Sequence, residues 1–154
     1  MDAGIDAGPE AGVDADVPPD AVQHHFCNEA FFKLPIDGQT QRTNSVAIQG
    51  GRVAWSWSKN PELELSGEIY LLDLSTCIEK RVTVGSEVLY VDIHETDLVW
   101  DDRKDGWDPW CSELYHSNLI LDTEERLTQT TQCELQPKTN GRYIAYLRTE
   151  TLTE

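Results

Sequence analysis

The sequence predicts an all-β fold, a partial β-propeller of about two four-stranded antiparallel blades plus the start of a third. One observation is an aromatic landmark that recurs once per blade along the 154-residue chain, at Trp55, Trp100 and Tyr146. Two further motifs repeat with the same step of about 45 residues, a period typical of propeller blades. They are Glu68–Tyr70 with Glu113–Tyr115, and Lys80–Thr83 with Glu125–Thr128. Three landmarks in one register indicate a duplicated unit.

Residues 1–25 differ in composition from the rest of the chain. An Asp-Ala-Gly or Glu-Ala-Gly unit recurs along them and is followed by Pro18 and Pro19. The segment has no basic and no aromatic residue, so it buries too little apolar surface to offset the entropy of ordering. We therefore expect a disordered acidic tether over residues 1–25 and a lead-in segment over residues 26–44.

The first blade is predicted over residues 45–87. Four short runs rich in β-branched and aromatic residues are separated by turn residues, which is the pattern of an antiparallel meander. The sequence places turns at Gly50-Gly51 and at Ser75–Cys77. The predicted strands lie around Val46–Ile48, Val53–Trp55, Ile69–Leu74 and Arg81–Val84.

The second blade is predicted over residues 88–133, and the start of a truncated third blade over residues 134–154. Asn140-Gly141 precedes the last strand run, and Asn-Gly between two such runs is a strong hairpin signal. No segment has the apolar stripe of an amphipathic helix. The predicted strands of the second blade lie around Leu89–Ile93, Leu98–Trp100, Leu114–Leu121 and Arg126–Thr128.

These units resemble the blades of the TolB-type β-propeller, a repeat family loosely called WD40-like. The matching stretches are Gly51–Trp55, Glu68–Leu74, Arg81–Thr83, Leu98–Arg103, Glu113–Tyr115, Glu125–Thr128 and Gly141–Tyr146. The resemblance implies a propeller fold and a binding role, because members act as protein-interaction platforms in the cell envelope. Similar propellers also accompany peptidase domains or carry sugar-processing sites. No catalytic motif matches, so no catalytic residue is carried over.

The predicted blades are too few to close a ring, since propellers have about 4–8. We therefore predict a segment of a TolB-like propeller that acts as a non-catalytic binding module of a bacterial envelope or secreted protein. Its loops would be presented to a protein or glycan partner. The alternative is a fragment of a propeller-containing hydrolase or lyase whose active site lies in other parts. Open blade edges also predict self-association.

Charge and motif content limit the classes of partner. With 28 acidic and 12 basic residues the formal net charge is −16, which repels phosphates and disfavours nucleic acid as a partner. No run approaches about 18 apolar residues, so no membrane-spanning segment is expected. Without a catalytic or cofactor-binding motif, we expect no enzymatic activity and no cofactor. The predicted location is the periplasm, the cell surface or the medium, although the chain as given shows no export signal.

The four cysteines are Cys27, Cys77, Cys111 and Cys133, and their spacing is not that of a metal site. An even number in an extracellular-looking domain favours two disulfides. Cys111 belongs to the second-to-third loop of the second blade and Cys133 to the connection leaving its fourth strand. Both lie at the same end of a meander, so this pair is predicted to bond. Cys77 lies in a turn at the other end, which leaves Cys27 for it by elimination. Four free thiols in a cytosolic protein are the alternative.

The most unusual stretch is residues 101–111, predicted as the loop between the second and third strands of the second blade. Exposed tryptophans often anchor interfaces, so one interpretation is a protein- or sugar-binding patch. A calcium site is disfavoured because Arg103 and Ser112 occupy ligand positions, and no metal is expected. The alternative is a long hairpin loop whose tryptophans cover its own base. The candidate binding residues are Asp101, Asp102, Asp105, Trp107 and Trp110.

Overall fold

The computed structural model describes residues 21–23, 27, 42–58, 67–104 and 111–149. Strands are the only regular elements of this part of the chain, which confirms the predicted all-β class. Within the same residues, no helix is long and apolar enough to cross a membrane. Most of the predicted tether and lead-in segment lies outside the described residues.

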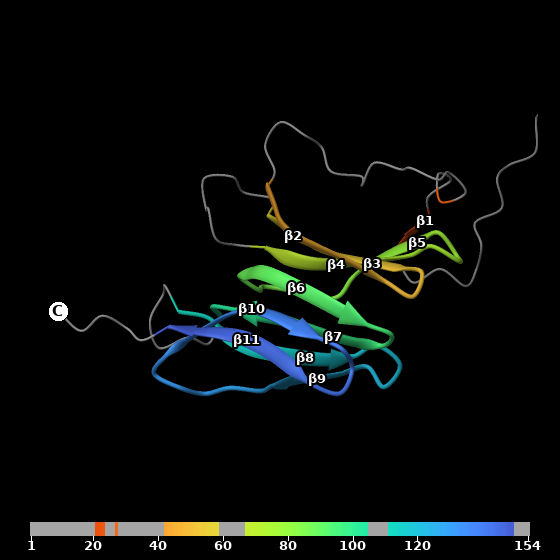
Figure 1. Cartoon of the computed structure of the whole chain (residues 1–154). Helices are drawn as coiled ribbons and strands as arrows, with labels where there is room; N and C mark the ends of the chain where they lie inside the picture. The colour runs from red at the N-terminus through yellow and green to blue at the C-terminus, as the bar shows by residue number, and fades with distance from the viewer. Residues whose placement is uncertain (1–20, 24–26, 28–41, 59–66, 105–110, 150–154) are drawn as a thin grey trace, which may run out of the picture.

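The described strands form three antiparallel sheets (Figure 1). The first sheet has the order β1-β5-β4-β3-β2, the second has the order β6-β7-β8-β9, and the third is the pair β10-β11. The first two sheets therefore correspond to two blades, and the pair to the beginning of a third. The strands are β1 (Ala21–Gln23), β2 (Arg42–Gln49), β3 (Arg52–Ser58), β4 (Glu68–Asp73), β5 (Ile78–Arg81), β6 (Val88–His94), β7 (Asp97–Asp102), β8 (Glu113–Asn118), β9 (Thr123–Arg126), β10 (Cys133–Thr139) and β11 (Ile144–Thr149).

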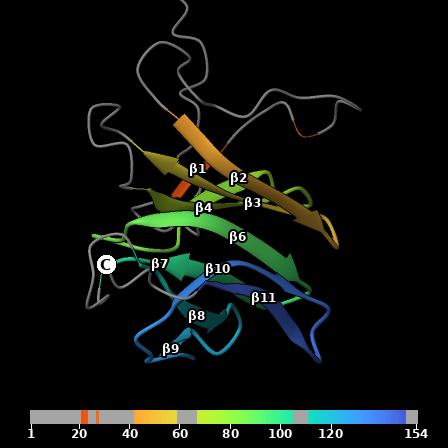
Figure 2. The same cartoon turned by 60° about the vertical axis from the view of Figure 1, so that its left-hand side comes forward.

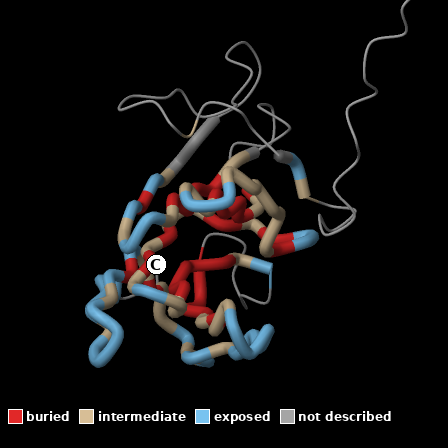
Figure 3. The backbone as a smooth tube through the Cα atoms, turned by 90° about the vertical axis from the view of Figure 1, so that its right-hand side faces the viewer, coloured by how far each residue is buried: buried red, intermediate tan, exposed pale blue. Residues whose placement is uncertain are grey.

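The first sheet lies against the second, and the core fills the space between them (Figures 1 and 2). Because side chains alternate along a strand, Ala54 of β3 points into this core while Val53 and Trp55 point to the other face of the sheet. Figure 3 shows the buried residues gathered in the interior of the molecule. The inter-blade core consists of Ala47, Ala54, Ile69 and Leu71 from the first sheet and Val88, Val91, Ile93, Leu98, Trp100 and Tyr115 from the second.

The aromatic landmarks occupy equivalent places in the two blades. Trp55 lies opposite Tyr70 in the β3–β4 ladder, with ring centroids 5.9 Å apart and planes 20° from parallel. Trp100 lies opposite Tyr115 in the β7–β8 ladder, with values of 5.8 Å and 18°. The predicted repeat register is therefore confirmed, since each tryptophan stacks on a tyrosine of the following strand.

The predicted fourth strands were placed too late in the chain. β5 covers Ile78–Arg81 and β9 covers Thr123–Arg126, so each strand ends at the arginine where the predicted strand began. The hydroxyl of Thr83 accepts the backbone N–H of Ile69, at 2.9 Å, in place of a ladder carbonyl. The chain leaves the sheet there because a side chain has replaced its backbone partner.

The third strand of the second blade also ends earlier than predicted. β8 stops at Asn118 rather than continuing to Leu121. The side-chain oxygen of Asn118 accepts the backbone N–H groups of Ile120 and Leu121, each at 3.1 Å. This Asx turn satisfies donors that a continued strand would have used, so the chain reverses into β9.

The prediction of disorder is wrong for three residues of the tether, and the first sheet has five strands rather than four. Ala21–Gln23 form β1, which pairs antiparallel with β5. An outer strand presents unpaired N–H and C=O groups, and any extended segment can satisfy them whatever its side chains. Composition therefore could not predict β1.

The two-stranded third sheet packs against the second blade through β10, which contacts β6, β7 and β8. Its outer strand β11 has no further strand beside it in the described part of the chain. Leu147 of β11 is 56% exposed, and Tyr143, which immediately precedes the strand, is 65% exposed. The predicted self-association through open edges stays a prediction.

Candidate functional site

Two of the five predicted binding residues lie in a strand rather than in a loop. Asp101 and Asp102 are the last residues of β7, and each is 0% exposed. The other three, Asp105, Trp107 and Trp110, lie outside the described residues. The placement of Asp101 and Asp102 on an exposed loop was therefore wrong, and their buried carboxylates are not available to a partner.

Asp101 joins the second blade to the third. Its Oδ1 accepts the backbone N–H groups of Tyr90 at 2.7 Å and Leu89 at 3.3 Å, and its Oδ2 accepts that of Gln136 at 3.0 Å. Burial raises the pKa of Asp101 to about 6, although these three hydrogen bonds favour the charged form. The side chain thus connects β6 with β10 through backbone groups.

Asp102 holds the start of the loop that follows β7. Its Oδ1 accepts the backbone N–H groups of Glu87 and Lys104, both at 2.9 Å. The Lys104 ammonium lies 3.8 Å from Oδ2. Within the described residues, no group of three or more His, Cys, Asp or Glu side chains is arranged to hold a metal ion.

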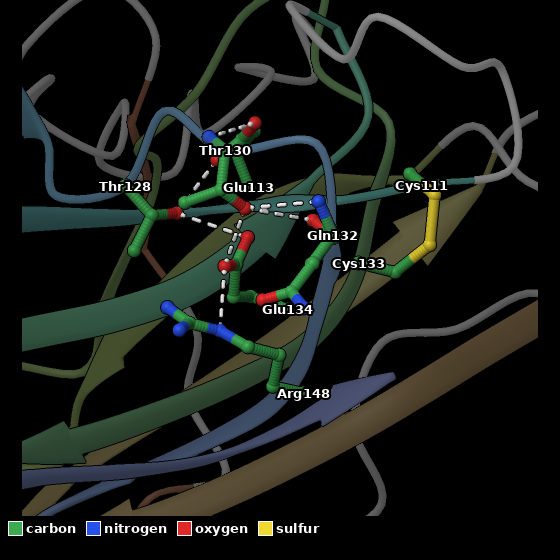
Figure 4. Close-up of a disulfide and its surroundings, with 8 residues drawn as sticks. All are labelled: Cys111, Glu113, Thr128, Thr130, Gln132, Cys133, Glu134 and Arg148. Carbon is green, nitrogen blue, oxygen red and sulfur yellow. Dashed lines mark hydrogen bonds and ion pairs between the residues drawn. A yellow bond between two sulfur atoms is a disulfide. The ribbon is translucent and has the colours of Figure 1, made fainter. Parts of the chain in front are cut away.

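The cysteines form the two predicted pairs. Cys27 is bonded to Cys77, with Cα atoms 5.6 Å apart, and Cys111 is bonded to Cys133, with Cα atoms 4.5 Å apart. The first bond attaches residue 27 to the turn between β4 and β5. The second attaches the β7–β8 connection to the first residue of β10 (Figure 4).

Buried carboxylates lie beside the second disulfide (Figure 4). Glu113 is 2% exposed and Glu134 is 0% exposed. The Thr128 hydroxyl is 2.7 Å from Glu113 and 3.4 Å from Glu134. Arg126 pairs with the first carboxylate at 3.0 Å and Arg148 with the second at 3.1 Å. Each of the two carboxylates is thus paired with an arginine, and the cluster joins the second blade to β10.

A groove lies along the outer rim of the described surface, where the first blade meets the second. It consists of two adjoining hollows of about 200 and 390 Å³ that share Lys80 and Leu119 in their linings. We call it the rim groove. Its lining comprises Arg52, Leu71, Asp73, Thr76, Ile78, Lys80, Arg81, Val82, Val84, Ser117, Leu119, Ile120, Asp122, Thr123 and Glu124.

Around its larger hollow, the rim groove has a basic wall and an acidic wall. Lys80 and Arg81 come from the first blade, whereas Asp122 and Glu124 come from the second. Arg81 is paired with Glu68 at 3.2 Å and Glu124 with Lys104 at 2.8 Å, so part of the charge is neutralised. The aliphatic side chains of Val84 and Ile120 are exposed at the edges of the groove. Such a surface suits a ligand with both polar and apolar groups.

Sequence reasoning missed the rim groove. Its walls come from residues roughly one repeat length, about 45 positions, apart, and neither wall is a motif by itself. The signal that could have found it is the repeat register, which places the end of one outer strand beside the turn of the next blade.

Stacked antiparallel sheets related by one repeat are blades of a β-propeller. The fold is that of a TolB-like propeller, of which this chain has a part. A protein described as TolB from Agrobacterium tumefaciens is similar at a TM-score of 0.58 and 11% identity, over 77% of this chain and 42% of that one. TolB from Acinetobacter baumannii is similar at 0.53 and 19% identity, over 70% of this chain and 27% of that one.

The chain therefore spans less than half the length of either structure, and at these identities the likeness concerns the fold. No protein-family model and no curated protein matches the chain. The fold defines a class of scaffold, and the rim groove is the candidate binding site on it.

Proposed function

We propose that the chain is a non-catalytic binding module of an exported protein and that it takes a protein partner in the rim groove. The observation that carries this proposal is the pair of exposed aliphatic side chains at the groove. Val84 is 73% exposed and Ile120 is 74% exposed. Burying such side chains against a partner gains about 25 cal/mol per Å² of apolar surface. The mixed charges of the walls would orient the partner.

A protein is favoured over a glycan by the chemistry of the lining. Sugar sites commonly use aromatic rings as stacking surfaces. Among the described residues that line the rim groove, none is aromatic. Apolar side chains bordered by polar and charged groups instead match the anatomy of a protein interface, which has an apolar centre and a polar rim.

The double variant V84D/I120D tests the groove. It places charges where apolar contact is proposed, at positions exposed enough to leave the fold intact. The matched control is I48D, because Ile48 is 67% exposed on β2 and does not line the groove. Each chain is immobilised and offered an envelope extract of the source cell. Partners retained by the parent and by I48D should be lost by V84D/I120D.

Equal retention by all three chains would reject the groove as the binding site. Thermal melting followed by circular dichroism checks that the double variant remains folded, so that lost binding is not lost structure.

The exported location is supported by the two disulfides, since such bonds persist in oxidising compartments. The expected outcome of thiol labelling in intact, acid-quenched cells is four cysteines that react only after reduction. Labelling of all four before reduction would place the protein in a reducing compartment and contradict the proposal.

A further inference from the structure

The outer strands of the two blades are equivalent in sequence position but not in pairing. β5 carries β1 on its outer edge, with Val22 opposite Glu79. β9 pairs with β8 and, in the described part of the chain, with no strand on its other side. Glu124 occupies in β9 the place that Glu79 occupies in β5, one repeat later. The outer edge of the first blade is thus covered by an added strand, whereas the equivalent edge of the second blade is open in the described part of the chain.

The hydrogen bonds of β9 show which groups face that edge. The backbone N–H of Leu127 donates to the carbonyl of Leu114 at 2.7 Å, in register with the β8–β9 ladder. Backbone groups alternate in direction along an antiparallel strand, so the N–H of Glu125 also points toward β8. The N–H and C=O of Glu124 therefore point outward. The Glu124 side chain is 43% exposed, and that of Glu125 is 66% exposed, so solvent reaches the edge.

We propose that β9 binds an extended segment of a partner protein by strand addition, with basic and aliphatic residues alternating in that segment. This inference rests on the proposed function, because Thr123 and Glu124 of β9 also line the rim groove. Main-chain bonds to Glu124 supply affinity, and alternate side chains supply specificity. The segment becomes the fifth strand of the second blade, as β1 is of the first.

The chemistry of the segment follows from both faces of the edge. An aliphatic residue opposite Glu124 repeats the relation of Val22 to Glu79 and faces the aliphatic lining of the rim groove. Its neighbours lie on the other face, next to Glu125 of β9. The carboxylate of Glu125 is 3.1 Å from His116 of β8, which in turn lies 3.0 Å from Asp97 of β7, further into the sheet. Basic side chains complement these acids and the net charge of −16. A second copy's β1 is disfavoured because it follows an acidic segment.

The test uses the whole chain with its disulfides and a short fluorescent peptide in which lysine alternates with valine. E124P removes the outward N–H, and an edge strand tolerates proline there because that group makes no bond to β8. E124T is the matched control, since it removes the same carboxylate and keeps the N–H. Fluorescence anisotropy should show about tenfold weaker binding to E124P and less than about threefold to E124T, as expected for a lost main-chain hydrogen bond and a blocked edge.

Two further peptides keep the test decisive if E124P fails to fold. A version of the peptide methylated on alternate backbone nitrogens should lose binding, and a version with glutamate in place of lysine should bind at least about tenfold more weakly. No binding of the lysine peptide, or equal binding by the methylated peptide, overturns strand addition. If E124P matches E124T while V84D/I120D abolishes binding, the groove binds through side chains, and the proposed function survives without this inference.

Discussion

The two blades use one polar motif in two settings. In the first blade, Glu68 pairs with Arg81 at 3.2 Å, and in the second, Glu113 pairs with Arg126 at 3.0 Å. Each blade also has a threonine hydroxyl that accepts a backbone N–H of the third strand at 2.9 Å. The side chain of Glu68 is 23% exposed, whereas that of Glu113 is 2% exposed. The geometry of this motif is therefore repeated in the two blades, but the burial of its glutamate is not.

The neighbouring strand causes the difference. Glu68 receives only a long contact from Gly85 N–H, at 3.4 Å, beyond its arginine and tyrosine partners. Around Glu113 the cluster extends to Glu134 of β10 through Thr128. The same ion pair is therefore screened by water in one blade and enclosed in the other, and its strength depends on that enclosure.

The largest effect is expected at the stacked tryptophans. Trp100 lies in the core between the blades, so Trp100→Ala should lower the free energy of unfolding by about 4 kcal/mol. Trp55 lies in a smaller cluster on the other face of the first sheet, so Trp55→Ala should cost about 1 kcal/mol less. Urea unfolding measures both. Equal costs would show that the outer face of the first blade is packed as well as the inter-blade core.

The next effect compares the two glutamates. Glu113→Gln leaves Arg126 without its buried partner and should cost about 3 kcal/mol. Glu68→Gln removes a partly exposed pair and should cost no more than about 1 kcal/mol. Unfolding at low and high salt provides the check. A larger cost for Glu68→Gln than for Glu113→Gln would mean that burial does not govern this motif.

The third effect, smaller than that of Glu113→Gln, is a pH dependence confined to the second blade. Asp101 corresponds in the repeat to Ser56, which does not titrate and donates to the Leu89 carbonyl at 3.1 Å. Burial raises the folded-state pKa of Asp101 to about 6 from an ordinary value of 3.8, so the protonated form is favoured in the folded state. Its contribution to stability is full below the ordinary value and is lost as pH rises through about 6.

This loss should be about 2 kcal/mol between about pH 4 and pH 7. The variant D101S puts the residue of the first blade into the second and should remove that slope. Chemical unfolding is measured at a series of pH values for the parent and the variant. The difference between their free energies of unfolding isolates the contribution of Asp101 from that of the other carboxylates. A difference that does not change with pH would contradict the assignment.

Much of the fold was predictable because its evidence is local and repeated. Trp55 and Trp100 locate equivalent strands by their spacing, and alternation of apolar residues identifies each strand. Even the Cys111–Cys133 pair followed from the ends of the meander at which the two loops lie. Strand ends were less predictable, because Thr83 and Asn118 end their ladders through side-chain hydrogen bonds.

The candidate site was not predictable in the same way. Asp101 and Asp102 stand next to a loop rich in charge, and sequence alone indicated exposure. Their burial depends on β6 and on Gln136, which is 35 residues away and supplies a backbone donor. The rim groove likewise forms only where two blades lie side by side, so neither blade's sequence shows it alone.

The sequence by itself determined the unit of this protein: its repeat, its strands, its stacked aromatic pairs and the loops that carry its cysteines. These depend on hydrogen bonding and side-chain alternation over a few consecutive residues. Only the tertiary structure decided which polar groups are enclosed, where the surface is hollowed and which outer strand is already paired. The physical reason is that the burial of a residue depends on the residues that pack against it, and in stacked blades those neighbours lie one repeat away in the sequence.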